Sequence, residues 1–373
     1  MKSFESGALR VVGRIGHLLL IWAAAFHGVY AVFPYFYVDL TLGGGVVLAF
    51  VPTILLLLIA VFVSGRVFRL IGELSRLIAV PVAGWRFVSF RFGKARGSRC
   101  LLDPPPLVNG ECSCVCYLLC HGLSLALLGL ILILLGFPFP EGAYFLRFFG
   151  LLAIAFAWRC LYPGVYGGTG NDGLQLLRLK KDPRWSAVIW LIRRVTVDME
   201  RAATFGDFSE ETVNALMDYR YTDPSRGEET VLMTYRAAIL FDRGEVEAAL
   251  AVYQEIADSA APELLKGRAY NELLYGAILR GASEEELKLR LNLVNASISR
   301  TRAPDSTGRR RVMLALRLLI QKDETRAEEE YDALLALAKN APFRAQAALD
   351  LREAKRVREI YRNEAGSTPA LKE

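Results

Sequence analysis

Glu73 lies in an apolar segment, at the position that a glutamate takes in the zinc-binding motif His-Glu-x-x-His. Histidines at positions i and i+4 of a helix present two imidazoles on one face, and a glutamate after the first can act as a base toward metal-bound water. The local string is Gly-Glu-Leu-Ser-Arg, so Gly72 and Arg76 occupy the two ligand positions. Glycine has no side chain, and a guanidinium has no lone pair to offer a metal. We therefore expect no zinc ligands at those two positions.

A group of cysteines beside one of the three histidines offers a different, softer metal site. Cys112, Cys116 and Cys120 are four residues apart, and His121 follows directly. On a helix that reaches back to Cys112 the thiols would form one stripe, and thiolates favour soft metals. The same cysteines also fit a role as small apolar residues in helix packing. The sequence leaves both alternatives open and indicates no other cofactor.

The elements that must position these residues follow from an uneven composition. The chain has 373 residues, 53% of them hydrophobic, and almost all long apolar runs come before about residue 165. This predicts a membrane domain over residues 1–200 and a cytoplasmic helical domain over 201–373. The formal net charge is +6, but many basic residues flank apolar runs instead of forming a stripe with aromatic residues. That distribution fits membrane loops and argues against nucleic-acid binding.

Four apolar runs are long enough to cross a bilayer as helices, namely residues 15–38, 45–65, 116–137 and 144–162. About 20 helical residues span a hydrocarbon core of about 30 Å. Basic residues before the first run, and a loop "PFPEG" without Lys or Arg, predict cytoplasmic N- and C-termini. We expect an integral protein of a bacterial inner or plasma membrane, with the lipid bilayer as a partner. The second run should break near Gly65 and continue as a half-buried helix to about Val82.

Period-two alternation in "GWRFVSFRFG", followed by "GKARG", predicts a β-hairpin over residues 84–102. Farther along, residues 234–258 form two amphipathic segments joined at Gly244, and Ala248 and Ala249 precede Tyr253 by about one turn. Small residues followed by an aromatic residue resemble a tetratricopeptide repeat, and a plain helical bundle is the alternative. Two similar units follow, with starts near Leu264 and Arg310 and turns at Gly281 and Asp323.

Three further motifs, taken with Glu73, resemble a bacterial branch of the site-2-protease family of membrane zinc metallopeptidases. "GWRFVSFRFG" is similar to the run that follows the zinc-binding helix in that branch. "CLLDPPP" is similar to its Cys-Leu-Met-Pro-Pro stretch, and "NDGLQLL" to the segment that carries its third zinc ligand. The resemblance covers about residues 45–200, with the motifs in the correct order.

The resemblance implies roles for individual residues. Glu73 matches the general base and Asp172 the third metal ligand, while Gly72 and Arg76 match the histidine ligands. Where the family has an asparagine followed by two glycines, this chain has Leu118 and, farther on, Cys120 and His121. Glu73 is then a remnant of a metal site, paired with Arg76 or Asp172, because a lone charge inside a membrane is costly.

The expected fold is mainly α: a polytopic helical membrane domain with a small β-hairpin, followed by a soluble α-helical repeat domain. A catalytic zinc site needs three protein ligands, so the leading hypothesis is a non-catalytic relative. It would bind a peptide or membrane-protein partner through the hairpin edge or the repeats. One alternative is an active metallopeptidase that completes a zinc site with His121, a cysteine and Asp172. The other is a membrane-anchored scaffold or assembly factor that acts through its repeats.

Overall fold

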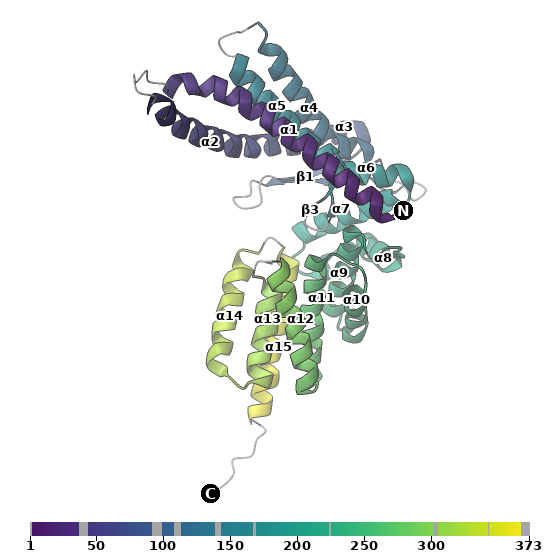
Figure 1. Ribbon diagram of the computed structural model, residues 1–373. Coiled ribbons are helices and arrows are strands. Elements are labelled where there is room, and N and C mark those ends of the chain that lie inside the picture. Colours follow the sequence, from purple (N-terminus) through teal and green to yellow (C-terminus); the bar gives the residue numbers. More distant parts are fainter. Residues whose placement is uncertain are drawn as a thin grey trace. The chain divides into compact units, whose positions relative to one another are not determined.

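The computed structural model describes residues 2–36, 44–91, 99–107, 113–138, 143–166, 169–223, 225–301, 305–341 and 343–366. The fold is mainly α-helical, with one antiparallel hairpin and one pair of two-residue strands (Figure 1). The chain divides into two compact units. The first contains the four long apolar helices and ends at Trp190. The second consists mainly of the chain from Leu191 onward, which begins within helix α7 (Trp185–Arg201), and also includes Thr169.

Four long apolar helices build the first unit: α1 (Lys2–Phe36), α2 (Gly44–Ser75), α4 (Val115–Leu135) and α5 (Ala143–Leu161). Four segments are long and apolar enough to cross a membrane, namely Val11–Val32, Val51–Ala83, Val115–Leu135 and Ala143–Leu161. The prediction of a membrane protein with four candidate transmembrane helices is therefore confirmed. The kind of membrane and the orientation of the chain stay predictions.

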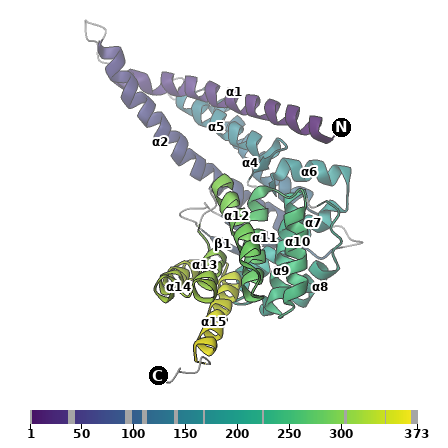
Figure 2. The same cartoon turned by 60° about the horizontal axis from the view of Figure 1, so that its bottom comes forward.

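Apolar side chains hold these helices together. Phe68 of α2 packs with Leu125 of α4 and with Phe148 and Leu152 of α5, and Ala24 of α1 completes the cluster. Helices α1 and α5 lie side by side in both views (Figures 1 and 2). Many large apolar side chains on the outer faces are exposed, as expected of helices that face lipid.

The predicted break near Gly65 is wrong. Helix α2 continues through Gly65, because the small residue lets the helix pack beneath the Phe156 ring of α5, where an added β-carbon would lie 3.0 Å from the ring. The helix instead changes at Arg76, with a 3-10 turn (Arg76–Ile78) followed by α3 (Ala79–Ala83). Gly84 then ends α3 with φ +70°. No separate half-buried helix follows Gly65.

The predicted hairpin forms from β1 (Arg86–Arg91) and β2 (Arg99–Asp103), which pair antiparallel with Phe90 opposite Cys100. The register shifts between Phe87 and Ser89. This bulge interrupts the predicted alternation within β1. Trp85, which precedes β1, is buried, and Phe87 is 53% exposed. The turn "GKARG" lies outside the described residues.

A short strand pair, β3 (Val165–Tyr166) with β4 (Thr169–Gly170), leads into α6 (Asp172–Lys181), and α7 follows. The second unit then consists of short helices and one 3-10 turn (Phe205–Asp207). Its helices are α8 (Glu210–Asp218), α9 (Gly227–Asp242), α10 (Val246–Asp258), α11 (Glu263–Leu279), α12 (Glu284–Thr301), α13 (Thr307–Ala315), a π-helical turn (Leu316–Ile320), α14 (Glu324–Lys339) and α15 (Arg344–Gly366).

Three successive helix pairs of the second unit meet at the predicted turns. Gly244 has φ +82° between α9 and α10, and Gly281 has φ +64° between α11 and α12, conformations that favour glycine. Asp323 caps the start of α14, because its side chain accepts a hydrogen bond from the Arg326 backbone N–H. Ala249 and Tyr253 are buried in the core, but Ala248 is exposed, because it lies on the opposite face of α10. Whether these pairs are tetratricopeptide repeats stays a prediction.

Candidate functional site

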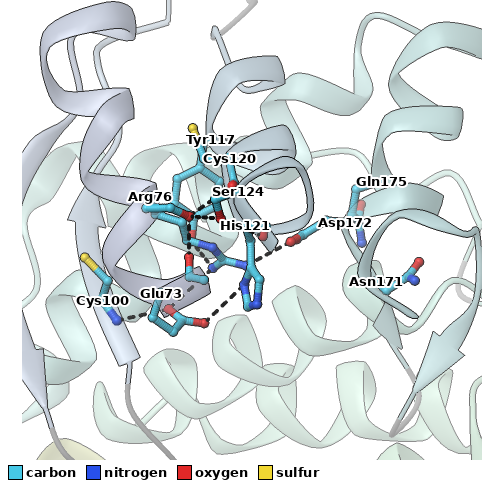
Figure 3. Close-up of polar contacts among 12 residues, drawn as sticks. Glu73, Arg76, Cys100, Tyr117, Cys120, His121, Ser124, Asn171, Asp172 and Gln175 are labelled. Carbon is cyan, nitrogen blue, oxygen red and sulfur yellow. Dashed lines mark hydrogen bonds and ion pairs between the residues drawn. The ribbon is translucent and has the colours of Figure 1, made fainter. Parts of the chain in front are cut away.

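Arg76 links three parts of the membrane unit (Figure 3). Its Nη2 donates a hydrogen bond to Asp172 Oδ2 at 2.9 Å, and its Nη1 donates to the Tyr117 hydroxyl at 2.6 Å. The same Nη1 lies 3.8 Å from Glu73 Oε2. One guanidinium is thus shared by two carboxylates from α2 and α6, whose sequence positions are far apart. We call Glu73, Arg76, Tyr117, His121 and Asp172 the Arg76 cluster.

The backbone places Arg76 at the point where α2 ends. Ser75, the last residue of α2, holds this turn with its hydroxyl oxygen, which lies 2.8 Å from Gly72 O and 3.0 Å from Cys120 O of α4. Ser124 Oγ of α4 also donates a hydrogen bond to Ser75 Oγ, at 2.9 Å. The small polar side chains therefore fasten the end of α2 to α4, and Arg76 emerges toward α4 with only 8% of its surface exposed.

Tyr117 forms the apolar wall of the cluster. The Arg76 guanidinium carbon lies 4.7 Å from the centroid of its ring, a cation–π contact. The Tyr117 ring also stacks on Trp85, with the ring centroids 4.3 Å apart and an interplanar angle of 11°. Trp85 is itself fixed by a hydrogen bond from Nε1 to Ser113 O at 3.1 Å. The hairpin entrance is thereby packed directly against the cluster.

Glu73 joins the cluster to the hairpin. Its Oε2 accepts a hydrogen bond from the backbone N–H of Cys100 in β2 at 3.0 Å, and its Oε1 lies 3.8 Å from His121 Nδ1. Burial and the charge of Glu73 raise the pKa of the Cys100 thiol to about 11, with Arg76 acting in the opposite direction. The carboxylate therefore binds the outer edge of β2, where it accepts a hydrogen bond from a backbone N–H that does not pair with β1.

His121 fills the space that a side chain at position 72 would need. A β-carbon built on Gly72 would lie 2.2 Å from His121 Cδ2 and 2.3 Å from Nε2. The imidazole comes from α4, not from the position expected of the first ligand on α2. The absence of a side chain at Gly72 therefore makes room for the imidazole of His121.

Asp172 is held in place by its neighbours in the "NDG" string. Asn171 caps α6 by accepting a hydrogen bond from Leu174 N, and its amide nitrogen donates to Arg159 O and Tyr162 O, both at 2.7 Å. Asp172 then stands at the helix N-terminus, where a negative charge is favourable. An added β-carbon on Gly173 would lie 1.8 Å from Leu161 O, so the backbones of α5 and α6 are in contact there.

The predicted cysteine stripe is present only in part. Cys116 and Cys120 place their sulfur atoms 3.6 Å apart, but α4 begins at Val115 and Cys112 lies outside the described residues. His121 faces Gly72 instead of the thiols, because consecutive helical residues point about 100° apart. Among the residues described, no group of three or more His, Cys, Asp or Glu side chains is placed to hold a metal ion.

The zinc site that the resemblance implies does not fit this geometry. Asp172 is already 2.9 Å from a guanidinium nitrogen and Glu73 is 3.8 Å from another. A metal ion bound by those carboxylates would lie within a few ångströms of that fixed positive charge. For unit charges about 4 Å apart the repulsion is about 4 kcal/mol at an effective dielectric constant of about 20, and a divalent ion doubles it. His121 Nδ1 lies 3.8 Å from Glu73 Oε1, and Asp172 is bound to Arg76. Among the described residues, His121, a cysteine and Asp172 form no group that could hold a metal ion.

Sequence reasoning missed Tyr117, Ser75, Ser124, Trp85 and Asn171 as parts of this site. Tyr117 precedes His121 by four residues, and that spacing on a helix could have placed it beside His121. Asn171 precedes Asp172 at a helix start, which is a common capping signal. The contact of Trp85 with Tyr117 joins residues from two distant segments, and neither pattern indicates it.

These contacts define a membrane-embedded polar centre organised around a buried arginine. The chain matches no protein-family model, no curated protein and no solved structure in the three comparisons made.

Proposed function

We propose that this chain is a non-catalytic relative of the site-2-protease-like membrane metallopeptidases that binds an extended segment of a peptide or membrane-protein partner. The observation that carries the proposal is the position of the Arg76 guanidinium between Glu73 and Asp172. These residues match the family's general base and third ligand. The guanidinium of Arg76, which is always charged, takes the place that a metal would have between them. The cluster therefore holds α2 and α6 together and is not a reaction centre.

The Arg76 cluster also fixes one edge of the hairpin. Asp172, Arg76, Glu73 and the Cys100 backbone amide form a continuous chain of polar contacts from α6 to β2. Glu73 covers part of the β2 edge, so the opposite edge, along β1, is the one suited to accept an added strand. Phe87 on β1 is 53% exposed and supplies an apolar contact for such a strand.

Metal content tests the first half of the proposal. The full-length protein, purified in detergent in the presence of zinc, is expected to contain far less than one zinc per chain by plasma mass spectrometry. Asp172→Ala should leave that value unchanged. About one zinc per chain, lost in Asp172→Ala, would favour the active-metallopeptidase alternative and would contradict this proposal.

Site-specific photocrosslinking in the native membrane tests the second half. A photoreactive amino acid at Phe87 should yield a defined adduct with a membrane-protein segment, because Phe87 is exposed on the edge strand β1. Val82 is the matched control, since it is 67% exposed and lies outside the strand. Equal crosslinking from Phe87 and Val82 would contradict edge pairing.

The scaffold alternative is favoured by one observation in the second unit. A cavity of about 210 Å³ there is lined by groups of both charges, including Arg268, Glu272, Arg309 and Asp350. Such a cavity suits a polar side chain of a protein partner. In the crosslinking experiment this alternative predicts adducts from Leu264, which lines the cavity and is 42% exposed, and none from Phe87.

A further inference from the structure

A second cavity lies in the membrane unit, at the end of the bundle where α1 begins and α5 finishes. Its volume is about 200 Å³, and its lining includes Arg14 and His17 of α1 and Trp158, Arg159 and Tyr162 from the end of α5. Helix α5, one of the candidate spans, ends at Leu161. The cavity therefore sits at the end of the α5 candidate span, and two of its lining residues, Arg159 and Tyr162, accept backbone hydrogen bonds from Asn171 beside the Arg76 cluster.

The charges around this cavity have one sign. Arg14 and Arg159 contribute two guanidinium groups, and no Asp or Glu is among the described residues that line it. Guanidinium groups bind phosphate oxygens in a two-pronged geometry, which makes arginine pairs suited to phosphate anions.

Aromatic rings form the floor of the cavity. Trp158 and Tyr162 stack with their centroids 5.0 Å apart and an interplanar angle of 17°. They pack on two glycines of α1: an added β-carbon would lie 2.5 Å from the Tyr162 ring at Gly13 and 2.8 Å from Trp158 at Gly16. Trp158 Nε1 also donates to Gly13 O at 3.1 Å, which fixes the indole. Trp and Tyr rings are enriched at the headgroup level of membranes.

His17 adds a polar group that the helix contacts orient. Its Nδ1 lies 3.1 Å from Ala155 O of α5, so a neutral imidazole with its hydrogen on Nδ1 leaves Nε2 as an acceptor. A headgroup hydroxyl is a suitable donor to that nitrogen. The combination of two cations, an oriented imidazole and an aromatic floor differs from a lipid-facing surface, which would be apolar throughout.

We infer that this cavity binds a phosphate anion, and that at the membrane surface the anion is the headgroup of an anionic phospholipid. Basic pockets between transmembrane helices bind such headgroups. The acyl chains would lie along the exposed apolar faces of α1, where Val11, Ile15 and Leu18 are more than half exposed. The inference does not depend on the proposed function, because it uses neither the hairpin nor the Arg76 cluster.

The test is a titration of lipid-stripped full-length protein in detergent, followed by native mass spectrometry. Phosphatidylglycerol is expected to bind about tenfold more tightly than phosphatidylcholine with the same acyl chains, since each basic group near a membrane surface favours anionic lipid. Arg14→Gln/Arg159→Gln should remove that preference. Arg66→Gln/Arg147→Gln loses the same charge outside the cavity and should keep it.

Three results would overturn the inference. Equal binding of the two lipids by the unchanged protein excludes an anion site, and an undiminished preference in Arg14→Gln/Arg159→Gln places it elsewhere. Inorganic phosphate that binds as tightly as phosphatidylglycerol excludes the lipid as the source. If the double variant does not fold, Arg14→Glu alone supplies the same test, because Arg14 is exposed and its replacement reverses one of the two charges.

Discussion

The imidazole of His121 lies directly against the backbone of Gly72, on the face of α2 that also carries Glu73. We predict that Gly72→Ala destabilises the protein by about 1–3 kcal/mol, because the added methyl group overpacks a site with no room for it. His121→Ala in the same chain should recover most of that loss. Denaturant unfolding in detergent of both single variants and the double variant measures the coupling.

Gly65→Ala is the matched control for this pair. It lies on the same helix, but its β-carbon would be 3.0 Å from the nearest atom of the Phe156 ring, and a ring edge can shift slightly. The cost there should be smaller. A Gly72→Ala protein as stable as the unchanged chain would show that the imidazole does not occupy this space.

Removal of the Arg76 charge should be among the most damaging changes in the membrane unit. Arg76→Met leaves the carboxylates of Glu73 and Asp172 without their shared cation, and breaking a buried ion pair costs about 3–5 kcal/mol. Arg76→Met/Asp172→Leu should be more stable than Arg76→Met alone, because an apolar pair replaces an unpaired charge. A double-mutant cycle by denaturant unfolding measures this.

Arg66→Met serves as the control for the Arg76 series. Arg66 is exposed on the same helix, and its guanidinium lies 4.5 Å from the Phe62 ring centroid. An exposed cation–π contact is worth about 0.5–1 kcal/mol. Equal losses for Arg66→Met and Arg76→Met, or additive effects of Arg76→Met and Asp172→Leu, would argue against a cluster centred on Arg76.

The sequence predicted the elements of the first unit well because long apolar runs and the positive charges at their ends are local signals. The predicted break at Gly65 was wrong. Glycine has a low helix propensity, but here it allows the Phe156 ring to pack closely on a continuous helix. The sequence predicted neither the bulge in β1 nor the stacking of Trp85 on Tyr117. Local patterns do not contain such contacts between distant segments.

The site shows the same division. Glu73, Arg76 and Asp172 were selected from motif positions, and the structure brings all three together; their family roles stay predictions. Tyr117 and the Cys100 backbone amide were not selected, because a hydrogen-bond partner from another element has no signature of its own. The direction of His121 toward Gly72 likewise follows from the packing of α4 on α2, which a single sequence does not specify.

The Cys100 thiol offers a chemical probe of the charge on Glu73. Burial and Glu73 raise its pKa from 9.0 to about 11, so alkylation by iodoacetamide in a variant whose only cysteine is Cys100 should be slow at pH 8 and increase toward pH 11. Because the folded pKa lies above the unfolded value, the associated stability is complete below pH 9 and is lost as the pH rises toward 11.

Glu73→Gln is the decisive variant for that probe. It removes the negative charge but keeps an oxygen that can accept the Cys100 N–H, so the midpoint of the alkylation profile should move to lower pH. Glu73→Asp, which keeps the charge, is the control and should retain a raised midpoint. A midpoint near 9 in the unchanged protein, or the same midpoint in Glu73→Gln, would contradict the contact between this carboxylate and β2.

In the second unit, the fully buried Arg311 should determine stability more than any surface ion pair. It pairs with Glu272 and lies 3.5 Å from Asp350, with its guanidinium 4.3 Å from the Tyr275 ring centroid. Burial opposes the charged form, but the two carboxylates outweigh it and raise the pKa of Arg311, so it stays charged at any working pH. Arg311→Met therefore removes the buried cation that contacts both carboxylates and should cost about 3–5 kcal/mol.

Arg326→Met is the matched control, because Arg326 is 63% exposed and pairs with Asp323 at 3.5 Å. Exposed pairs contribute about 0–1 kcal/mol. Hydrogen exchange of the full-length protein, followed by mass spectrometry of peptides from α11, α13 and α15, resolves the effect locally. Protection should fall in all three helices for Arg311→Met and stay unchanged for Arg326→Met; a loss confined to α13 would mean that Arg311 does not join these helices.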